Sequence, residues 1–275
     1  MTKRIAVTGS TGFVGGFVAR ELAASGIPLR LLVRDPAKAP ALGEVVQSTY
    51  LGATPEHLEG IDTLFMVSAA ENEERLTEHF AFLDAVEKAG VKHIVYTSFF
   101  GAAPDSTFTL GRDHFATEER ITSMGIGYTF LRDNLYSDFL PFMVGEDGVI
   151  RGPAGEGRAA LVSRSDVGRV ASVVLRDPAA HANLTYNLTG PEAVTLTDAA
   201  AILTANGTPA TFHNETVPEA WASREKYGAP DWQVEAWVST YTAIAAGELA
   251  HVHHDIELVT GRPAESIAEV LDPKR

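Results

Sequence analysis

The sequence predicts an α/β protein: a doubly wound, mainly parallel β-sheet followed by a smaller C-terminal α+β lobe. Two observations support this fold class. Short apolar runs alternate with longer segments of helical periodicity, and the first such alternation contains a glycine-rich turn. The 275 residues are 45% hydrophobic, which is enough for a large folded core.

Six short runs rich in Val, Ile, Leu or Phe are predicted to be the first strands of the sheet. They cover residues 4–8, 29–34, 45–48, 64–68, 93–98 and 128–132. A later run, residues 184–188, is expected to return as a further strand.

The helices are predicted from apolar spacing and from their end signals. Residues 72–89 carry an apolar stripe at spacings of four and three, formed by Leu76, Phe80, Leu83 and Val86. Gly90 follows as a left-handed C-terminal cap. A later helix is expected to begin with Asp166 as its N-cap, and another with Thr197 or Asp198 as its cap.

Three glycines, Gly9, Gly12 and Gly15, form a G-x-x-G-x-x-G pattern between the first predicted strand and the first predicted helix. Such a turn lets the backbone approach a diphosphate, and it directs the positive end of the helix dipole at that charge. The alternative is a tight turn without a ligand, but the position of the pattern favours a dinucleotide site. The predicted cofactor-binding residues here are Gly9, Ser10, Thr11, Gly12, Phe13, Val14 and Gly15.

The second predicted strand ends in charged residues that bear on coenzyme choice. An acidic residue at this point binds the ribose of NAD, whereas an arginine accommodates the 2′-phosphate of NADP. Both Arg34 and Asp35 are present, and Lys38 lies one turn further on. Arg34 and Lys38 together favour NADP(H), although a solvated surface pair is the alternative.

The alternation of strands and helices breaks down after Arg132, and residues 145–158 are dense in glycine. We therefore expect residues 1–150 to form an NAD(P)-binding Rossmann core. Residues 151–275 are expected to form a smaller, partly interleaved lobe on the substrate side.

Composition excludes several classes of protein. The formal charge of −14 argues against a nucleic-acid or anionic-membrane partner, because phosphates would be repelled over most of the surface. There is no cysteine, which excludes disulfides, thiolate metal sites and cysteine nucleophiles. No apolar run reaches the roughly 18 residues of a membrane span, so a cytoplasmic protein is expected. The oligomeric state is left open.

The motif T-G-x-T-G-x-x-G, from Thr8 to Gly15, occurs here with the segments LVRDPAK and GIGYTFLRDN. This combination resembles the NmrA-like branch of the atypical short-chain dehydrogenases, especially the NADPH:quinone reductase type. The resemblance implies a Rossmann domain that binds NADP(H), with a small C-terminal lobe over the nicotinamide. It also adds Ser68, Ala69 and Ser98 to the expected cofactor site.

The sequence departs from typical short-chain dehydrogenases at their Tyr-x-x-x-Lys motif. Leu110 stands where the tyrosine belongs and His114 where the lysine belongs, and either Ser98 or Phe99 takes the serine position. Leucine cannot accept the proton that alcohol oxidation requires. His114 is the catalytic candidate, expected near its own pKa at neutral pH as a hydrogen-bond or proton donor. The alternative is that His114 only holds the nicotinamide ribose.

This departure favours reduction of a quinone-like or conjugated aromatic acceptor by direct hydride transfer, without flavin or metal. A quinone is already an electrophile and needs mainly proximity and a hydrogen bond to the developing charge. Phe99, Phe100 and Trp232 are expected to stack on such a substrate. Asn134 and Tyr136 are expected to orient the nicotinamide or the substrate. The alternative function is a non-catalytic NmrA-like redox sensor that binds NADP(H); a nucleotide-sugar epimerase fits less well.

The stretch HVHHD, residues 251–255, is the one sequence feature that suggests a metal. His251 and Asp255 are four residues apart, but no carboxylate or cysteine cluster accompanies them. A solvated surface is expected there, and no metal site is predicted.

Overall fold

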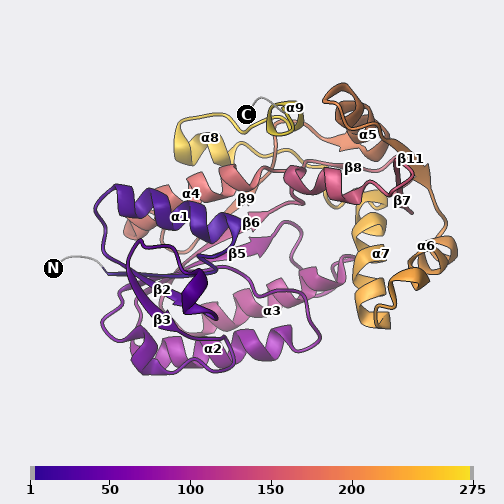
Figure 1. The fold of residues 1–275 in the computed structure, drawn as a ribbon. Helices are drawn as coiled ribbons and strands as arrows, with labels where there is room; N and C mark the ends of the chain where they lie inside the picture. The colour runs from indigo at the N-terminus through magenta and orange to yellow at the C-terminus, as the bar shows by residue number, and fades with distance from the viewer. Residues whose placement is uncertain (1–3, 273–275) are drawn as a thin grey trace. The chain divides into compact units, whose positions relative to one another are not determined.

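The computed structural model of the chain describes residues 4–272 (Figure 1). Its main element is a seven-stranded sheet in the order β3-β2-β1-β4-β5-β6-β9. The strands are β1 (Ile5–Thr8), β2 (Leu29–Val33), β3 (Glu44–Gln47), β4 (Thr63–Met66), β5 (His93–Phe99), β6 (Gly127–Asp133) and β9 (Leu184–Leu188). The pairs β1–β2, β1–β4, β2–β3 and β4–β5 are parallel. The predicted fold class is confirmed.

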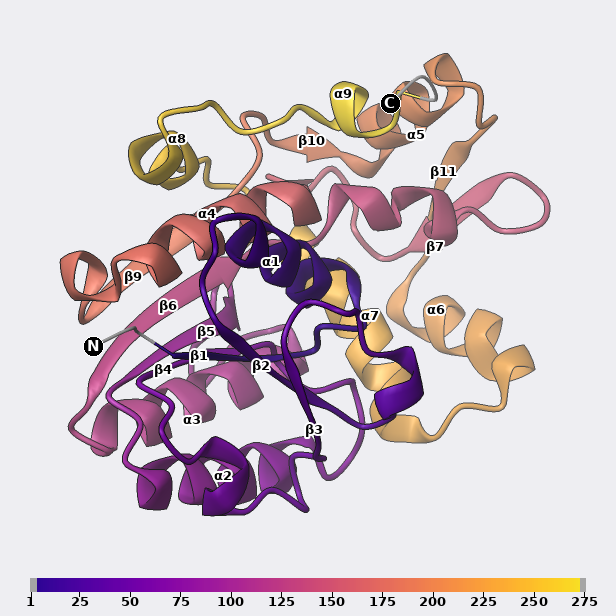
Figure 2. The same ribbon diagram turned by 60° about the vertical axis from the view of Figure 1, so that its left-hand side comes forward.

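The central strands are buried along their whole length, as expected for a parallel sheet covered on both faces. Helices α1 (Phe13–Ala24) and α4 (Arg164–Arg176) cover one face, and α2 (Arg75–Ala89) and α3 (Thr109–Ser123) cover the other (Figure 2). The edge strand β3 is the exception, since three of its four residues are exposed.

Three details of the predicted helices were wrong. Helix α2 buries His79, Phe82, Leu83 and Val86, while Phe80 is 37% exposed, because the buried face is rotated from the predicted stripe. Helix α4 begins before Asp166, whose N–H donates to the Ser163 hydroxyl over 3.0 Å. In α5 (Leu196–Ala205) the cap is Thr195, and Asp198 completes a capping box with it. Gly90 does adopt the left-handed conformation predicted for it, with φ of 76°.

The chain divides into two compact units that exchange segments along the sequence. Unit 1 contains the residues up to Ser98, Asp113–Arg132 and Val167–Tyr186; unit 2 contains Phe99–Arg112, Asp133–Asp166 and the chain from Asn187 onward. The domain boundary at residue 150 stays a prediction. Unit 1 holds most of the seven-stranded sheet and all the residues of the glycine-rich turn.

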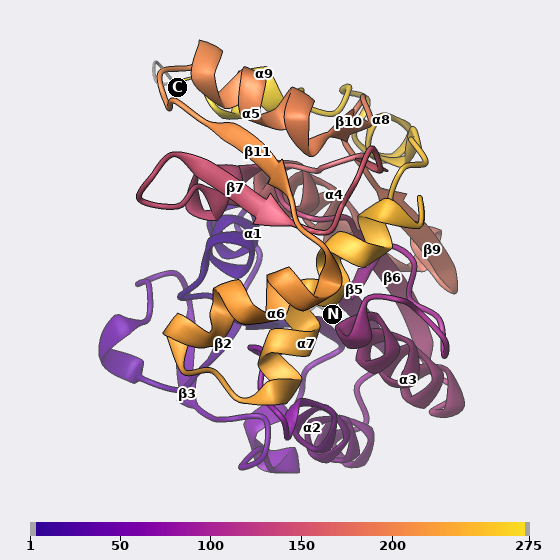
Figure 3. The ribbon, with the colours of Figure 1, turned by 90° about the vertical axis from the view of Figure 1, so that its right-hand side faces the viewer.

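Unit 2 is built around two small sheets and several helices (Figure 3). Strand β7 (Val149–Gly152) pairs in parallel with β11 (Thr211–Asn214), and β8 (Arg158–Ala159) pairs antiparallel with β10 (Val194–Thr195). The remaining helices of this unit are α6 (Val217–Arg224), α7 (Asp231–Ala245), α8 (Asp255–Thr260) and α9 (Ile267–Val270).

Candidate functional site

The glycine-rich turn joins β1 to α1 in a conformation that requires glycine at two of its positions. Gly9 has φ of +64°, in the left-handed region that side chains disfavour. A Cβ on Gly15 would lie only 2.4 Å from the Gly9 carbonyl oxygen, so α1 approaches the strand too closely for any side chain there. Gly12 precedes α1 and has no side chain to cap it. This end of the helix therefore presents backbone to a ligand.

Ser10 supplies the most direct sign of a ligand in this turn. Its side chain is 3% exposed, and within residues 4–272 its hydroxyl oxygen has no hydrogen-bond partner. An unsatisfied buried polar group costs about 1–3 kcal/mol. A phosphate oxygen bound in the turn would accept from this hydroxyl, so the residues present fit a diphosphate.

The charged residues after β2 differ in how they are engaged. Asp35 accepts a hydrogen bond from the Ala37 N–H (3.1 Å) and lies 3.8 Å from the Lys38 ammonium. Its carboxylate therefore caps the short helical turn Pro36–Lys38. Arg34 directly follows β2 and has an exposed side chain. Because Asp35 is engaged in this cap, the residues are compatible with a phosphate contact by Arg34, and that contact stays a prediction.

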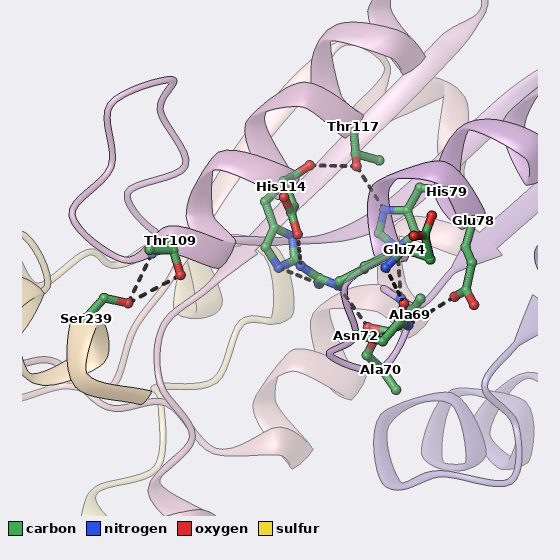
Figure 4. A network of polar contacts seen from close by, with 12 residues as sticks. Ala69, Ala70, Asn72, Glu74, Glu78, His79, Thr109, His114, Thr117 and Ser239 are labelled. Atoms are coloured by element: carbon green, nitrogen blue, oxygen red, sulfur yellow. Dashed lines mark hydrogen bonds and ion pairs between the residues drawn. The ribbon is translucent and has the colours of Figure 1, made fainter. Parts of the chain in front are cut away.

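The turn after β4, residues 68–70, is held by three side chains from two other elements, β5 and α2. The Ser68 N–H donates to the Thr97 hydroxyl (2.8 Å) and the Ala69 N–H donates to Nε2 of His79 (2.9 Å). The Ala69 carbonyl accepts from Nε of Arg75 (3.1 Å). Figure 4 shows the part of this network that joins Ala69 to His79.

His114 lies inside the same network, and its surroundings change its expected role. Its Nε2 accepts from the Arg75 guanidinium (2.9 Å), and its Nδ1 bonds the Tyr96 hydroxyl (2.9 Å). Burial, and secondarily the charge of Arg75, hold the pKa of His114 well below its ordinary value. The expectation that His114 titrates near neutral pH was therefore wrong, because the imidazole is buried beside a cation.

Ser98 is also tied within unit 1. Its hydroxyl donates to Glu118 (2.5 Å), and Glu118 in turn pairs with Arg132 through two contacts of 2.9 and 2.5 Å. Leu110, at the position of the tyrosine, is buried and apolar. The cofactor-binding role of Ser98 stays a prediction.

The five predicted substrate residues all belong to unit 2, and four of them are engaged there. Phe99 packs on Phe108 with ring centroids 4.7 Å apart, and Phe100 packs on His253 at 5.4 Å. The Asn134 amide donates to the Leu249 carbonyl (3.0 Å). Tyr136 donates to Asp133, and Trp232 is half-buried in α7. Their contact with a substrate stays a prediction.

Sequence reasoning missed four residues that organise this region: Arg75, His79, Tyr96 and Glu118. A weak signal existed for two of them, since Arg75 and His79 are four residues apart and therefore share a face of α2. The buried Leu83 continues that face at the same spacing. No local pattern marked Tyr96 or Glu118 as polar groups of the core.

Two features are absent from residues 4–272. No group of three or more His, Asp or Glu side chains is placed to hold a metal ion, and this includes the HVHHD stretch. No helix in this part of the chain combines the length and the apolarity needed to cross a membrane.

Comparison with known families places this geometry in context. Residues 1–228 match the NmrA-like family. The chain belongs to the NmrA-like family. It is 32% identical to an NAD(P)H azoreductase of Xenophilus azovorans and 33% identical to quinone oxidoreductase 2 of Escherichia coli. Each alignment covers 96% of this chain and 96% of the relative.

Solved structures agree with this assignment. The NADPH complex of an NADPH-dependent quinone oxidoreductase from Escherichia coli superposes with a TM-score of 0.87 at 31% identity, covering 97% of this chain and 98% of that one. The triphenylmethane reductase of Citrobacter sp. complexed with NADP(H) gives a TM-score of 0.84 at 30% identity, with the same coverage.

Proposed function

We propose that this protein is an NADP(H)-dependent reductase that transfers a hydride from the nicotinamide to a quinone-like or other conjugated aromatic acceptor. One observation carries the proposal: a turn shaped for a diphosphate, with the orphaned Ser10 hydroxyl, lies in a chain similar over its full length to quinone and azo-dye reductases.

In this proposal different residues of unit 1 bind different parts of the coenzyme. The backbone of the glycine-rich turn and the Ser10 hydroxyl would hold the diphosphate. Arg34, with Lys38 nearby, would hold the 2′-phosphate by charge. Ser68, Ala69 and Ser98 complete the proposed set of cofactor contacts. When bound, NADPH supplies the hydride for the reaction.

The acceptor class follows from what the chain offers in place of the missing tyrosine. Leu110 has no proton to give, and His114 is held neutral with Nε2 used as an acceptor. An acceptor whose reduced form is a stabilised anion does not need a strong acid, so a quinone or a conjugated dye fits better than a simple ketone. In this proposal Phe99, Phe100 and Trp232 provide apolar contacts, and Asn134 and Tyr136 orient the acceptor.

His114 has a different part in this proposal from that of a proton donor. Its contacts with Arg75 and Tyr96 join α2, β5 and α3. We assign it the role of a positioning residue behind the coenzyme site.

Turnover distinguishes the reductase from a redox sensor. A sensor needs no proton donor, so the lack of an acid at Leu110 and His114 is also compatible with that function. The test mixes the protein with NADPH and a panel of quinones and azo dyes while the nicotinamide absorbance is followed. A reductase consumes NADPH with at least one acceptor, and it uses NADPH in preference to NADH. Tight NADPH binding without turnover on any acceptor would instead favour the sensor.

A further inference from the structure

We propose that Arg75 and His79 are positioning residues that fix the turn at residues 68–70 for NADP(H) by holding both polar groups of the Ala69 backbone. We call this pair the Ala69 clamp. The inference rests on the proposed function, and it adds two residues of α2 to the determinants of coenzyme affinity.

The clamp acts on one residue from one helix face. Nε2 of His79 accepts from the Ala69 N–H at 2.9 Å, and Nε of Arg75 donates to the Ala69 carbonyl at 3.1 Å. The preceding N–H, that of Ser68, is held by Thr97 at 2.8 Å. Both clamp side chains are buried, at 3% and 0% exposure, so water cannot readily replace them.

The proton positions in the clamp follow from its neighbours. Because His79 accepts at Nε2, its proton is on Nδ1, from which it donates to the Thr117 hydroxyl (2.9 Å). The Thr117 hydroxyl then donates to the Asp113 carbonyl (2.7 Å). The His79 arm of the clamp is therefore anchored to α3, and its imidazole has one defined orientation (Figure 4).

The Arg75 arm is anchored to the same helix. Its second terminal nitrogen donates to His114 (2.9 Å), and its first lies 3.5 Å from the Asp113 carboxylate. Burying a guanidinium is costly, the more so because Nη1 of Arg75 has no hydrogen-bond partner within residues 4–272. A turn that only connected β4 to α2 would not need an arginine and a histidine directed at the two backbone polar groups of a single residue. The energetic cost of burying these side chains is explained if the turn must keep one conformation for a ligand.

Two substitutions at the same position test the His79 arm. His79→Phe keeps a planar ring but removes the acceptor, whereas His79→Gln retains an acceptor for the Ala69 N–H. We expect His79→Phe to raise the Kd for NADPH about tenfold, the effect of losing one buried hydrogen bond. His79→Gln should restore the Kd to within about threefold of the wild type.

Amide hydrogen exchange measures the local stability of the turn directly and needs no coenzyme. Amide exchange over residues 68–72 should be faster in coenzyme-free His79→Phe than in the wild type, and close to the wild type in His79→Gln. Should His79→Phe fail to fold, Thr97→Val removes only the acceptor of the Ser68 N–H and is expected to change exchange and Kd in the same direction.

Arg120→Gln is the matched control. Arg120 also links α3 to α2, through Asp84 (2.8 Å) and Glu87 (2.6 Å), but at an exposed site away from the turn. A rise in the Kd for NADPH with Arg120→Gln equal to that with His79→Phe would overturn the clamp proposal. Any weakening of the contact between α2 and α3 would then be enough to reduce coenzyme affinity. If the wild type binds NADPH but the clamp variants show unchanged amide exchange and an unchanged Kd, the clamp proposal is overturned as well. A wild type that binds no NADPH would instead refute the proposed function.

Discussion

The stability of the protein is expected to fall as the pH is lowered below the ordinary pKa of histidine, because several imidazoles, including those of His79 and His93, are buried in their neutral form. Burial, with a smaller contribution from Arg75, lowers the pKa of His79 from 6.5 to about 3. Burial and the neighbouring His181 lower the pKa of His93 to about 4. His93 bonds the Thr129 hydroxyl at 2.9 Å from within β5.

The sign of the effect follows from proton binding. In the unfolded chain both histidines bind a proton as the pH falls through 6.5, while in the folded chain they stay neutral until the pH approaches the lowered values. The stability is therefore complete above the unfolded pKa and is lost progressively below it. Between about pH 7.5 and pH 5, each histidine is expected to cost about 2 kcal/mol of unfolding free energy.

Urea unfolding at these two pH values, in the wild type and in His79→Gln and His93→Gln, measures the effect. Comparison with variants is needed because the formal charge of −14 also diminishes toward pH 5, which relieves self-repulsion in every variant. The pH-dependent loss should be smaller by about 2 kcal/mol in each variant than in the wild type. His254→Gln, which changes an exposed imidazole, is the control and should keep the full loss. A full loss in His79→Gln would refute the buried neutral state.

Three substitutions test other parts of the site. Arg34→Ala should weaken NADPH binding at least tenfold through loss of a charge-assisted contact, with little effect on NADH; equal losses for both coenzymes would remove the phosphate assignment. Ser10→Ala should weaken NADPH binding but leave the coenzyme-free protein as stable as the wild type or up to about 1 kcal/mol more stable, because the hydroxyl has no partner without a ligand. Thermal melts with and without NADPH measure both effects, and a clear destabilisation of the coenzyme-free protein would contradict the prediction. Glu118→Gln should lower the unfolding free energy by about 2 kcal/mol, because it leaves the Arg132 charge partly buried without its carboxylate; denaturant unfolding checks this, and unchanged stability would show that the ion pair contributes little.

The sequence was informative where structure depends on local pattern. Apolar runs bounded by turn residues predicted the first six strands to within one or two residues at each end, and the strand at residues 184–188 was predicted without error. The strand-to-helix position of the glycines predicted the turn at Gly9 to Gly15, since only that residue type permits the approach.

The failures concern contacts between segments distant in the sequence. Arg75 and His79 look like polar residues of a surface helix, and only the fold shows that they face the turn after β4 and helix α3. The same holds for His114, whose pKa is lowered by burial in the fold and, secondarily, by the charge of Arg75, 39 residues away. The parallel pairing of β7 with β11 likewise depends on residues about 60 positions apart, which no periodicity reveals.

Isothermal titration calorimetry of the wild type with NADPH and with NADH is the most direct test of the coenzyme site. We expect saturable heat with NADPH, weaker binding of NADH, and loss of that preference in Arg34→Ala. The absence of heat with both coenzymes would contradict a dinucleotide site at the glycine-rich turn, and with it the assignment of this protein as a reductase.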